Sequence, residues 1–113
     1  MVSEQPADLD AIFHSLADPT RRAMLRRLSE GDCKMAELAA PFSMSFPAVA
    51  KHIRVLEDAG IVTRRAQGRA ILVRLEAQRL KTAQAWLQFY EQFWSQRLDA
   101  LDVAIRENRK DKK

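Results

Sequence analysis

The sequence predicts a mainly α-helical fold with a small β-hairpin, ending in one long C-terminal helix. Three observations support this fold class. Apolar side chains recur at helical spacing, most clearly at Val49, Ile53 and Leu56. The stretch 61–75 is rich in Ile, Val and Leu and contains a Gln-Gly pair that permits a tight reversal between two strands. Only three glycines and a 47% hydrophobic fraction indicate a compact, folded chain.

Three short helices are expected in the first third of the chain, at about 8–16, 19–29 and 34–41. The second begins at Asp18-Pro19, because an Asp N-cap accepts a free backbone N–H and a proline at the first position loses no hydrogen bond. The expected inward side chains are Leu9, Ile12, Phe13 and Leu16 in the first helix, Met24, Leu25 and Leu28 in the second, and Met35, Leu38 and Ala39 in the third.

A fourth helix is predicted to begin after the N-cap Ser45 and to end at Ala59-Gly60. Its inward side carries Val49, His52, Ile53 and Leu56. Its outward side carries Pro47, Ala50, Lys51 and Arg54, two small or rigid residues and two long cations. Such a face fits a DNA major groove, which a bulky acidic surface could not enter.

The hairpin predicted over 61–66 and 70–75 is basic around its tip. The tip residues are Arg64, Arg65, Gln67 and Arg69. A helix-turn-helix followed by such a hairpin indicates a winged helix-turn-helix, a DNA-binding fold. Residues 43–75 hold six Lys or Arg against two Asp or Glu, and residues 19–30 hold four Arg against one Glu. Phosphates favour this clustering through counterion release, although arginines on a helix can also be plain solvated surface.

The last element is predicted to be one helix over about 76–106, followed by a charged tail, 107–113, that is expected to fray. Five of the eight aromatic residues of the chain lie in this helix, and its apolar arc is wider than one core face needs. We therefore expect a homodimer that pairs through this helix; the alternative is a helix wrapped fully by its own domain. The expected interface residues are Leu80, Trp86, Leu87, Phe89, Tyr90, Phe93, Trp94, Leu98 and Leu101.

Two segments make a family recognisable: LADPTRRAMLRRLSEG (16–31) and AELAAPFSMSFPAVAKHIRVLEDAGIV (36–62). With the Arg-rich hairpin they closely resemble the ArsR-type winged-helix bacterial repressors, in the branch with an aromatic C-terminal helix and no evident metal site. The resemblance covers about residues 9–100. It implies a cytoplasmic dimer that binds an inverted-repeat operator in double-stranded DNA and represses transcription, often of its own operon, with an effector that the sequence leaves unknown.

The resemblance also implies roles for individual residues. Recognition-helix and turn contacts to DNA fall on Ser43, Ser45, Pro47, Ala50, Lys51 and Arg54; wing contacts fall on Arg64, Arg65, Gln67 and Arg69; backbone contacts fall on Arg21 and Arg22. Lys51 and Arg54 can reach guanine acceptors, whereas Ala50 could meet only a thymine methyl. The family's third helix usually opens with Ser or Thr where this chain has Lys34, so Asp32 or water is expected to cap it.

The sequence predicts no metal site and no cofactor. Cys33 is the only cysteine, and a metal sensor needs at least three converging soft or imidazole ligands. Cys33 is expected to be a plain residue, with a redox-sensitive thiol or a metal ligand as alternatives. His52 is expected to pack beneath the fourth helix, with a phosphate contact as the alternative.

Other function classes find little support in the sequence. No run of about 18 apolar residues predicts a membrane span, and the acidic N-terminus does not read as a secretory signal. No Ser/His/Asp set or phosphate-binding glycine loop predicts an enzyme. The competing hypotheses are a metal- or thiol-responsive sensor using Cys33, and a dimeric interaction module that has lost DNA binding.

Overall fold

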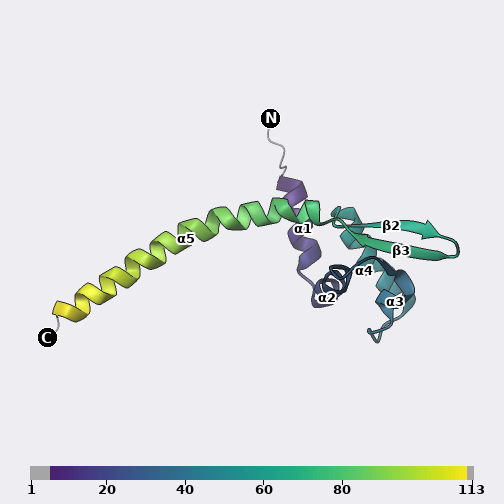
Figure 1. Ribbon diagram of the computed structural model, residues 1–113, viewed down its shortest axis with the longest axis horizontal. Helices are drawn as coiled ribbons and strands as arrows, with labels where there is room; N and C mark the ends of the chain where they lie inside the picture. The colour runs from purple at the N-terminus through teal and green to yellow at the C-terminus, as the bar shows by residue number, and fades with distance from the viewer. Residues whose placement is uncertain (1–5, 112–113) are drawn as a thin grey trace. The chain divides into compact units, whose positions relative to one another are not determined.

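The computed structural model describes residues 6–111, which divide into two compact units, residues 6–83 and 84–111. The first unit holds helices α1 (Pro6–Leu16), α2 (Pro19–Leu28), α3 (Met35–Ala39) and α4 (Phe46–Asp58), and strands β1 (Cys33–Lys34), β2 (Val62–Gln67) and β3 (Ala70–Leu75). Helix α5 (Ala77–Asp111) begins in the first unit and makes up the described part of the second. Figure 1 shows the β2–β3 hairpin reaching beyond α3 and α4. The predicted mainly helical fold with a small hairpin is confirmed.

Helices α2 and α4 begin as the sequence predicts. The carboxylate of Asp18 accepts a hydrogen bond from the backbone N–H of Arg21 (3.0 Å), with Pro19 in the first turn. The Ser45 hydroxyl accepts one from the N–H of Ala48 (3.3 Å). Each acceptor satisfies one of the N–H groups that a helix start leaves free. Both predicted N-caps are therefore confirmed.

Helix α3 is shorter than the predicted 34–41. Lys34 belongs to β1, and the helix ends at Ala39. Pro41 has no N–H to bond the carbonyl four residues back, so the helical ladder cannot continue through it. The short length therefore follows from a strand at one end and a proline at the other.

The start of α3 is not capped by Asp32, which was one expectation. Asp32 instead accepts both Nη2 (2.9 Å) and Nε (3.1 Å) of Arg74 on β3. The carboxylate of Glu37 accepts from the backbone N–H of Lys34 (3.3 Å), reaching back to the residue before the helix. Glu37, the third residue of α3, thus provides the side-chain acceptor at the start of this helix, where Asp32 or water was expected.

The three strands form an antiparallel sheet in the order β1-β3-β2. Cys33 pairs with Val73, and Gln67 pairs with Ala70 at the tip of the hairpin. The turn is therefore made by residues 68 and 69, one position later than the sequence indicated, and Gly68 has φ +62° there. Strand β1 was not predicted, because two residues are too few to show the alternation that identifies a strand.

The core of the first unit draws on every element. Its almost fully buried apolar side chains are Ile12, Met24, Leu28, Cys33, Met35, Leu38, Val49, Ile53, Leu56, Ile61, Val62 and Val73. Three of these anchor α4, and burying a side chain of this size contributes about 1.5–3 kcal/mol. The inward predictions are confirmed, with Leu9, Phe13, Leu16 and Ala39 only partly buried. Helix α4 is thus fixed from below while its outward side stays free.

Gly60 closes the connection from α4 to β2 and touches the start of α5. Its φ is +79°, a left-handed conformation that favours glycine. A Cβ at this position would lie 2.7 Å from Nε of Arg79. Any side chain here would therefore strain the backbone and would also require the flexible Arg79 side chain to shift.

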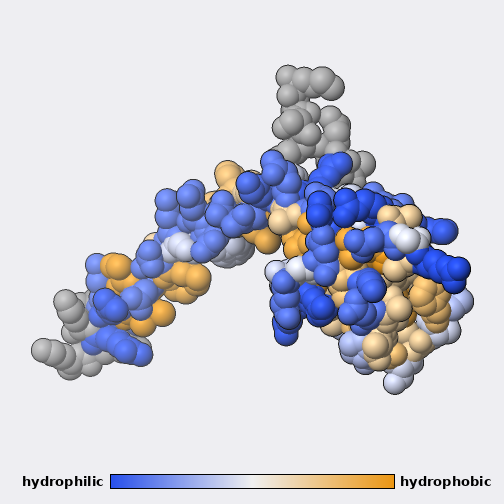
Figure 2. All heavy atoms as spheres, turned by 45° about the vertical axis from the view of Figure 1, so that its right-hand side comes forward, coloured by the Kyte–Doolittle hydropathy of each residue, from blue (hydrophilic) through white to orange (hydrophobic). Residues whose placement is uncertain are grey.

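The second unit is a single helix whose large apolar side chains are exposed. Trp86, Leu87, Phe89, Tyr90, Phe93, Trp94, Leu98, Leu101, Val103 and Ile105 are each at least 40% exposed. Figure 2 shows hydrophobic side chains in orange gathered along this helix. The centres of the Trp86 and Tyr90 rings lie 4.5 Å apart, and Cζ of Arg97 lies 4.6 Å from the centre of the Phe93 ring.

Helix α5 extends beyond its predicted end near residue 106, because residues 107–111 continue it; residues 112–113 lie outside the described part. This segment contains no glycine or proline, and most of its residues are good helix formers. One turn earlier, Nη2 of Arg106 lies 3.1 Å from Oδ2 of Asp102, an i,i+4 pair of the kind that supports a helix. Charge alone therefore did not end the helix.

Candidate nucleic-acid interface

The outward side of α4 forms an open groove of about 550 Å³. Its lining residues are Pro47, Ala50, Lys51, Arg54, Val55 and Asp58. Four of them are the outward residues that the sequence predicted, so the structure brings those four together. Lys51 and Arg54 are exposed, whereas Ala50 is half-buried. The groove thus has an apolar floor with long cations at its side, and Asp58 is the one acidic residue in the lining.

The turn before α4 carries the two serines of the predicted site. Ser43 is exposed in the connection from α3, and Ser45 is exposed at the N-cap. The Ser45 hydroxyl already accepts the N–H of Ala48, but it keeps its own O–H for donation. Both serines could therefore donate to a phosphate oxygen near the start of the helix.

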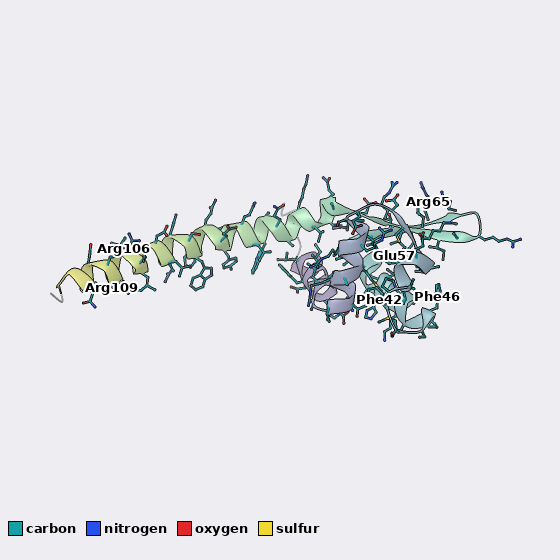
Figure 3. The ribbon with its side chains drawn as sticks, turned by 60° about the horizontal axis from the view of Figure 1, so that its bottom comes forward. Phe42, Phe46, Glu57, Arg65, Arg106 and Arg109 are labelled. Carbon is teal, nitrogen blue, oxygen red and sulfur yellow. The ribbon has the colours of Figure 1, made fainter. Side chains whose placement is uncertain are left out.

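The wing presents exposed side chains at Arg65, Gln67 and Arg69. Figure 3 shows Arg65 on the wing, apart from Phe46 at the start of α4. Arg65 on β2 pairs with Leu72 on β3, while Gln67 and Arg69 flank the turn at Gly68. These three side chains lie at or near the tip of the hairpin and are open to an approaching phosphate backbone.

Arg64 differs from Arg65 and Arg69 because its guanidinium is paired with a carboxylate of the same chain. Its Nη2 and Nε lie 2.8 Å and 3.1 Å from Oε1 of Glu57 on α4. Both side chains of this ion pair are about one third exposed. The pair joins the wing to the fourth helix, so Arg64 must give up or share this contact before it reaches DNA.

Arg21 does not lie where a DNA contact requires it. It is only 9% exposed, and its Nε and Nη2 donate to the carbonyl oxygens of Ser15 (2.7 Å) and His14 (3.0 Å). These carbonyls belong to the last turn of α1, where the His14 carbonyl also accepts the backbone N–H of Ala17 (3.1 Å). Arg21 therefore joins α2 to the end of α1. Its burial argues against the predicted contact between Arg21 and the DNA backbone.

The same guanidinium also meets the recognition helix. Nη1 of Arg21 lies 3.3 Å from Nδ1 of His52, which also lies 3.9 Å from Oδ2 of Asp18. A guanidinium has no acceptor, so Nδ1 of His52 is the acceptor in this contact. His52 thus packs beneath α4, as the sequence predicted, in contact with the start of α2.

The pKa of the Asp18 carboxyl is lowered, mainly because this group accepts the backbone N–H of Arg21. Burial is the second-largest effect and acts against this shift, while the charge of Arg21 and the backbone N–H of Thr20 lower the pKa by smaller amounts. Arg22, in contrast, is exposed and donates only from Nη1 to the carbonyl of Leu16 (2.9 Å). Of the two arginines expected at the DNA backbone, only Arg22 is positioned at the surface.

Cys33 is 2% exposed in strand β1, and its thiol lies 3.4 Å from the carbonyl oxygen of Lys34. Burial raises the pKa of this thiol, while the charge of Arg27 acts against the shift. Redox-sensing cysteines are typically accessible and have a lowered pKa. Between residues 6 and 111, no three His, Cys, Asp or Glu side chains gather closely enough to hold a metal ion.

Helix α5 supplies the surface expected to pair two chains. Eight of the nine predicted interface residues are exposed, whereas Leu80 packs partly against the core of its own unit. Ala83 in the same turn is 4% exposed. The expectation for Leu80 is therefore corrected, because the first turns of α5 are used inside the chain. None of the helices in the described residues is long and apolar enough to cross a membrane.

Two residues beside the predicted DNA-binding face of α4 were not predicted from the sequence. Phe46, the first residue of α4, is 54% exposed, and Glu57 faces the wing rather than the solvent. Both lie at the edge of the outward face rather than at its centre. The signal for Phe46 was present: a large apolar residue sits directly between the N-cap Ser45 and Pro47, outside the inward stripe.

Comparisons with known proteins agree with this geometry. Residues 18–64 match the family described as "Bacterial regulatory protein, arsR family". The HTH-type transcriptional regulator Rv2034 of Mycobacterium tuberculosis is 35% identical over 89 residues, spanning 79% of this chain and 80% of that protein. The transcriptional repressor SdpR of Bacillus subtilis is 28% identical over 79 residues, spanning 70% of this chain and 88% of the repressor. A crystal structure of an ArsR family transcriptional regulator superposes with TM-score 0.77 at 41% identity, covering 83% of this chain and 97% of that one.

Proposed function

This chain belongs to the arsR family of bacterial regulatory proteins, and from that premise we propose that it represses transcription as a homodimer on an inverted-repeat operator. It is a winged helix-turn-helix transcriptional regulator, and the relatives reported above are named as regulators or repressors. The operator, the two-fold assembly and repression of its own operon are the proposed parts. The proposal places the protein in the cytoplasm, where the operator lies, and names no effector.

The outward face of α4 carries the proposal. The helix is anchored by three fully buried side chains, while the opposite side offers Ala50, Lys51 and Arg54 around an open groove. Lys51 and Arg54 are long enough to reach the O6 and N7 acceptors of guanine in the major groove. Because the core holds the backbone of α4 in place, the positions from which these two side chains extend are fixed before DNA binds.

The wing supports the same assignment with a different kind of contact. Arg65 and Arg69 are exposed on a hairpin that leaves the body of the domain. Contacts of this kind bind phosphates and fix the register of the protein without reading the sequence. Arg22, Ser43 and Ser45 are further exposed side chains that can donate hydrogen bonds to phosphate oxygens.

Exposed apolar side chains on residues 84–111 support the homodimer. Large contiguous apolar surface is rare on monomers, and covering it is favourable by about 25 cal/mol for each Å². The other side of the same helix is polar, with Gln88, Glu91, Gln92, Ser95 and Gln96 together. An apolar side opposite a polar side is what a helix paired with a second copy needs.

The paired variants Trp94→Asp and Gln92→Asp test the dimer. Both place the same charge on α5, but only the first places it on the apolar side. We expect Trp94→Asp to shift the protein to a monomer in sedimentation and to weaken operator binding by about a hundredfold or more, because one chain then binds only one half-site. Gln92→Asp keeps the dimer. Equal behaviour of the two variants would contradict pairing through this side.

A pool of random duplexes tests the operator itself. A two-fold dimer should select an inverted repeat whose half-sites lie about 34 Å apart, one helical turn of DNA. Arg54→Ala should weaken the selected site by about 1–3 kcal/mol and relax one base preference, with a smaller loss on random DNA. Equal losses on both would remove the base-reading role, and no preference among duplexes would support the alternative of an interaction module without DNA binding.

A further inference from the structure

Phe46 is a bulky apolar side chain placed in the open at the start of the recognition helix. It is 54% exposed, and among the described residues of the first unit the only other exposed large apolar side chain is Ile71 on β3, at 38%. Leaving more than half of a Phe side chain in water forgoes stabilisation that its burial would supply. Phe46 is not needed for the N-cap, which Ser45 provides. The core stripe of α4 also runs on another side of the helix.

Phe46 lies beside the groove on α4, next to one of its lining residues rather than in the lining itself. Residues four apart on a helix lie one above the other, so Phe46 adjoins Ala50, and Pro47 follows it in the first turn. Ala50 carries only a methyl group, which leaves the space beside the ring open. Lys51 and Arg54 line the same groove. An occupant of this face must therefore be apolar at one point and negatively charged where it meets Lys51 and Arg54, away from Asp58.

DNA offers that combination in the major groove. The C5-methyl group of a pyrimidine is the apolar feature of the groove floor, phosphates line its edges, and a Phe or Ala side chain can contact the methyl group. Residues at the N-terminus of a recognition helix are those that contact base edges. Resting on the proposed function, we propose that Phe46, with Ala50 beside it, reads the C5-methyl group of one pyrimidine in each half-site.

The methyl group is the chemistry that is recognised, and two bases carry it. Thymine has it by nature, and 5-methylcytosine presents the same group on a different pairing edge. A site that reads the methyl group alone accepts either base, whereas a site that reads the O4 acceptor of thymine rejects 5-methylcytosine. The operator position opposite Phe46 is therefore expected to prefer thymine over cytosine and to recover binding when that cytosine is methylated.

Deoxyuridine provides the test, because it differs from thymidine by this methyl group alone. Starting from the selected operator, each thymine is replaced in turn by deoxyuridine in both half-sites, and Kd is measured at low salt so that weakened variants still bind. Removing one buried methyl costs about fourfold in Kd, or about fifteenfold for two half-sites. We expect one thymine position to show this loss with the natural protein, and Phe46→Ala to show none there.

Two further variants separate the methyl contact from general weakening. Phe46→Leu keeps an apolar side chain and should retain part of the deoxyuridine penalty, whereas Ile71→Ala should retain all of it. Because Phe46 is exposed, Phe46→Ala should melt at the temperature of the natural protein.

The outcomes distinguish this inference from the proposed function. Operator binding with no deoxyuridine penalty at any thymine, or the same penalty in Phe46→Ala, would overturn the methyl contact while leaving the repressor proposal in place. Failure of 5-methylcytosine to restore binding would also overturn it, in favour of readout of the thymine O4 atom. A natural protein without preference among duplexes would overturn both.

Discussion

Replacing Arg21 by Ala should unfold the protein more easily without acting at the DNA surface. Arg21 is 9% exposed and gives a 2.7 Å bond to the carbonyl of Ser15 and a 3.0 Å bond to that of His14. A bond from a charged donor is worth about 1.5–3 kcal/mol where it is buried. The Ser15 bond is buried, whereas the His14 carbonyl can recover part of its loss from water.

The expected loss in the free energy of unfolding is therefore about 3 kcal/mol. For a domain of this size that corresponds to a melting temperature lower by about 12 °C. The assay is urea unfolding at one fixed protein concentration, because dimer dissociation and unfolding are coupled. Arg21→Lys should recover less than half of the loss, since one ammonium group cannot reproduce the rigid fork of a guanidinium.

Arg22→Ala is the matched control, because it removes the neighbouring arginine from the exposed side of the same helix. Its stability should change by no more than about 0.5 kcal/mol. Its affinity for random DNA should fall, and the slope of log affinity against log salt should become shallower by about one. An Arg21→Ala protein with unchanged stability and a shallower salt slope would refute the interior role of Arg21.

Three further predictions follow from side chains already described. Glu57→Gln should free Arg64, raise DNA affinity about two- to tenfold and steepen the salt dependence by up to about one unit of slope; weaker binding would count against a wing contact by Arg64. The pKa of Asp18 is lowered in the folded protein. Its contribution to the free energy of unfolding is therefore present above the unfolded pKa near 3.8 and is lost as the pH falls below that value. In acid, the free energy of unfolding should thus fall more steeply with decreasing pH for the natural protein than for Asp18→Asn. Identical curves would contradict this. Cys33, buried and with a raised pKa, should react with a thiol reagent at least about tenfold more slowly in the folded protein than in urea, and fast labelling in the folded state would reopen the redox alternative.

Much of the fold was predictable because its signals are local. The N-cap Asp18, the N-cap Ser45 and the apolar stripe of α4 are each written within a few consecutive residues, so helix starts and inward faces could be assigned from the sequence. The outward face of α4 followed directly, since it is the complement of that stripe. Pairing of β2 with β3 is also local, and the sequence missed its turn by a single residue.

The remaining features depend on distant partners. Strand β1 exists because Cys33 pairs with Val73, forty positions later, and two residues carry no pattern of their own. The sequence around Arg21 is basic and typical of an exposed segment. Only the contact with the last turn of α1 shows that Arg21 is an interior residue. Leu80 fits the apolar stripe of α5, but the packing of its own unit occupies that turn. Composition could not distinguish these roles.

The exposed aromatic side of α5 also bears on the fate of a newly made subunit. Under the proposed assembly, a chain leaving the ribosome carries uncovered Trp94 and Phe89 side chains until it meets a second chain. During that interval the subunit is a substrate for chaperones and proteases, so scarce subunits are lost faster than abundant ones. Because two chains must meet to form the dimer, the fraction of promoter that is bound would then change more steeply than the rate at which the chain is made. A modest fall in production could release the promoter without any small-molecule signal.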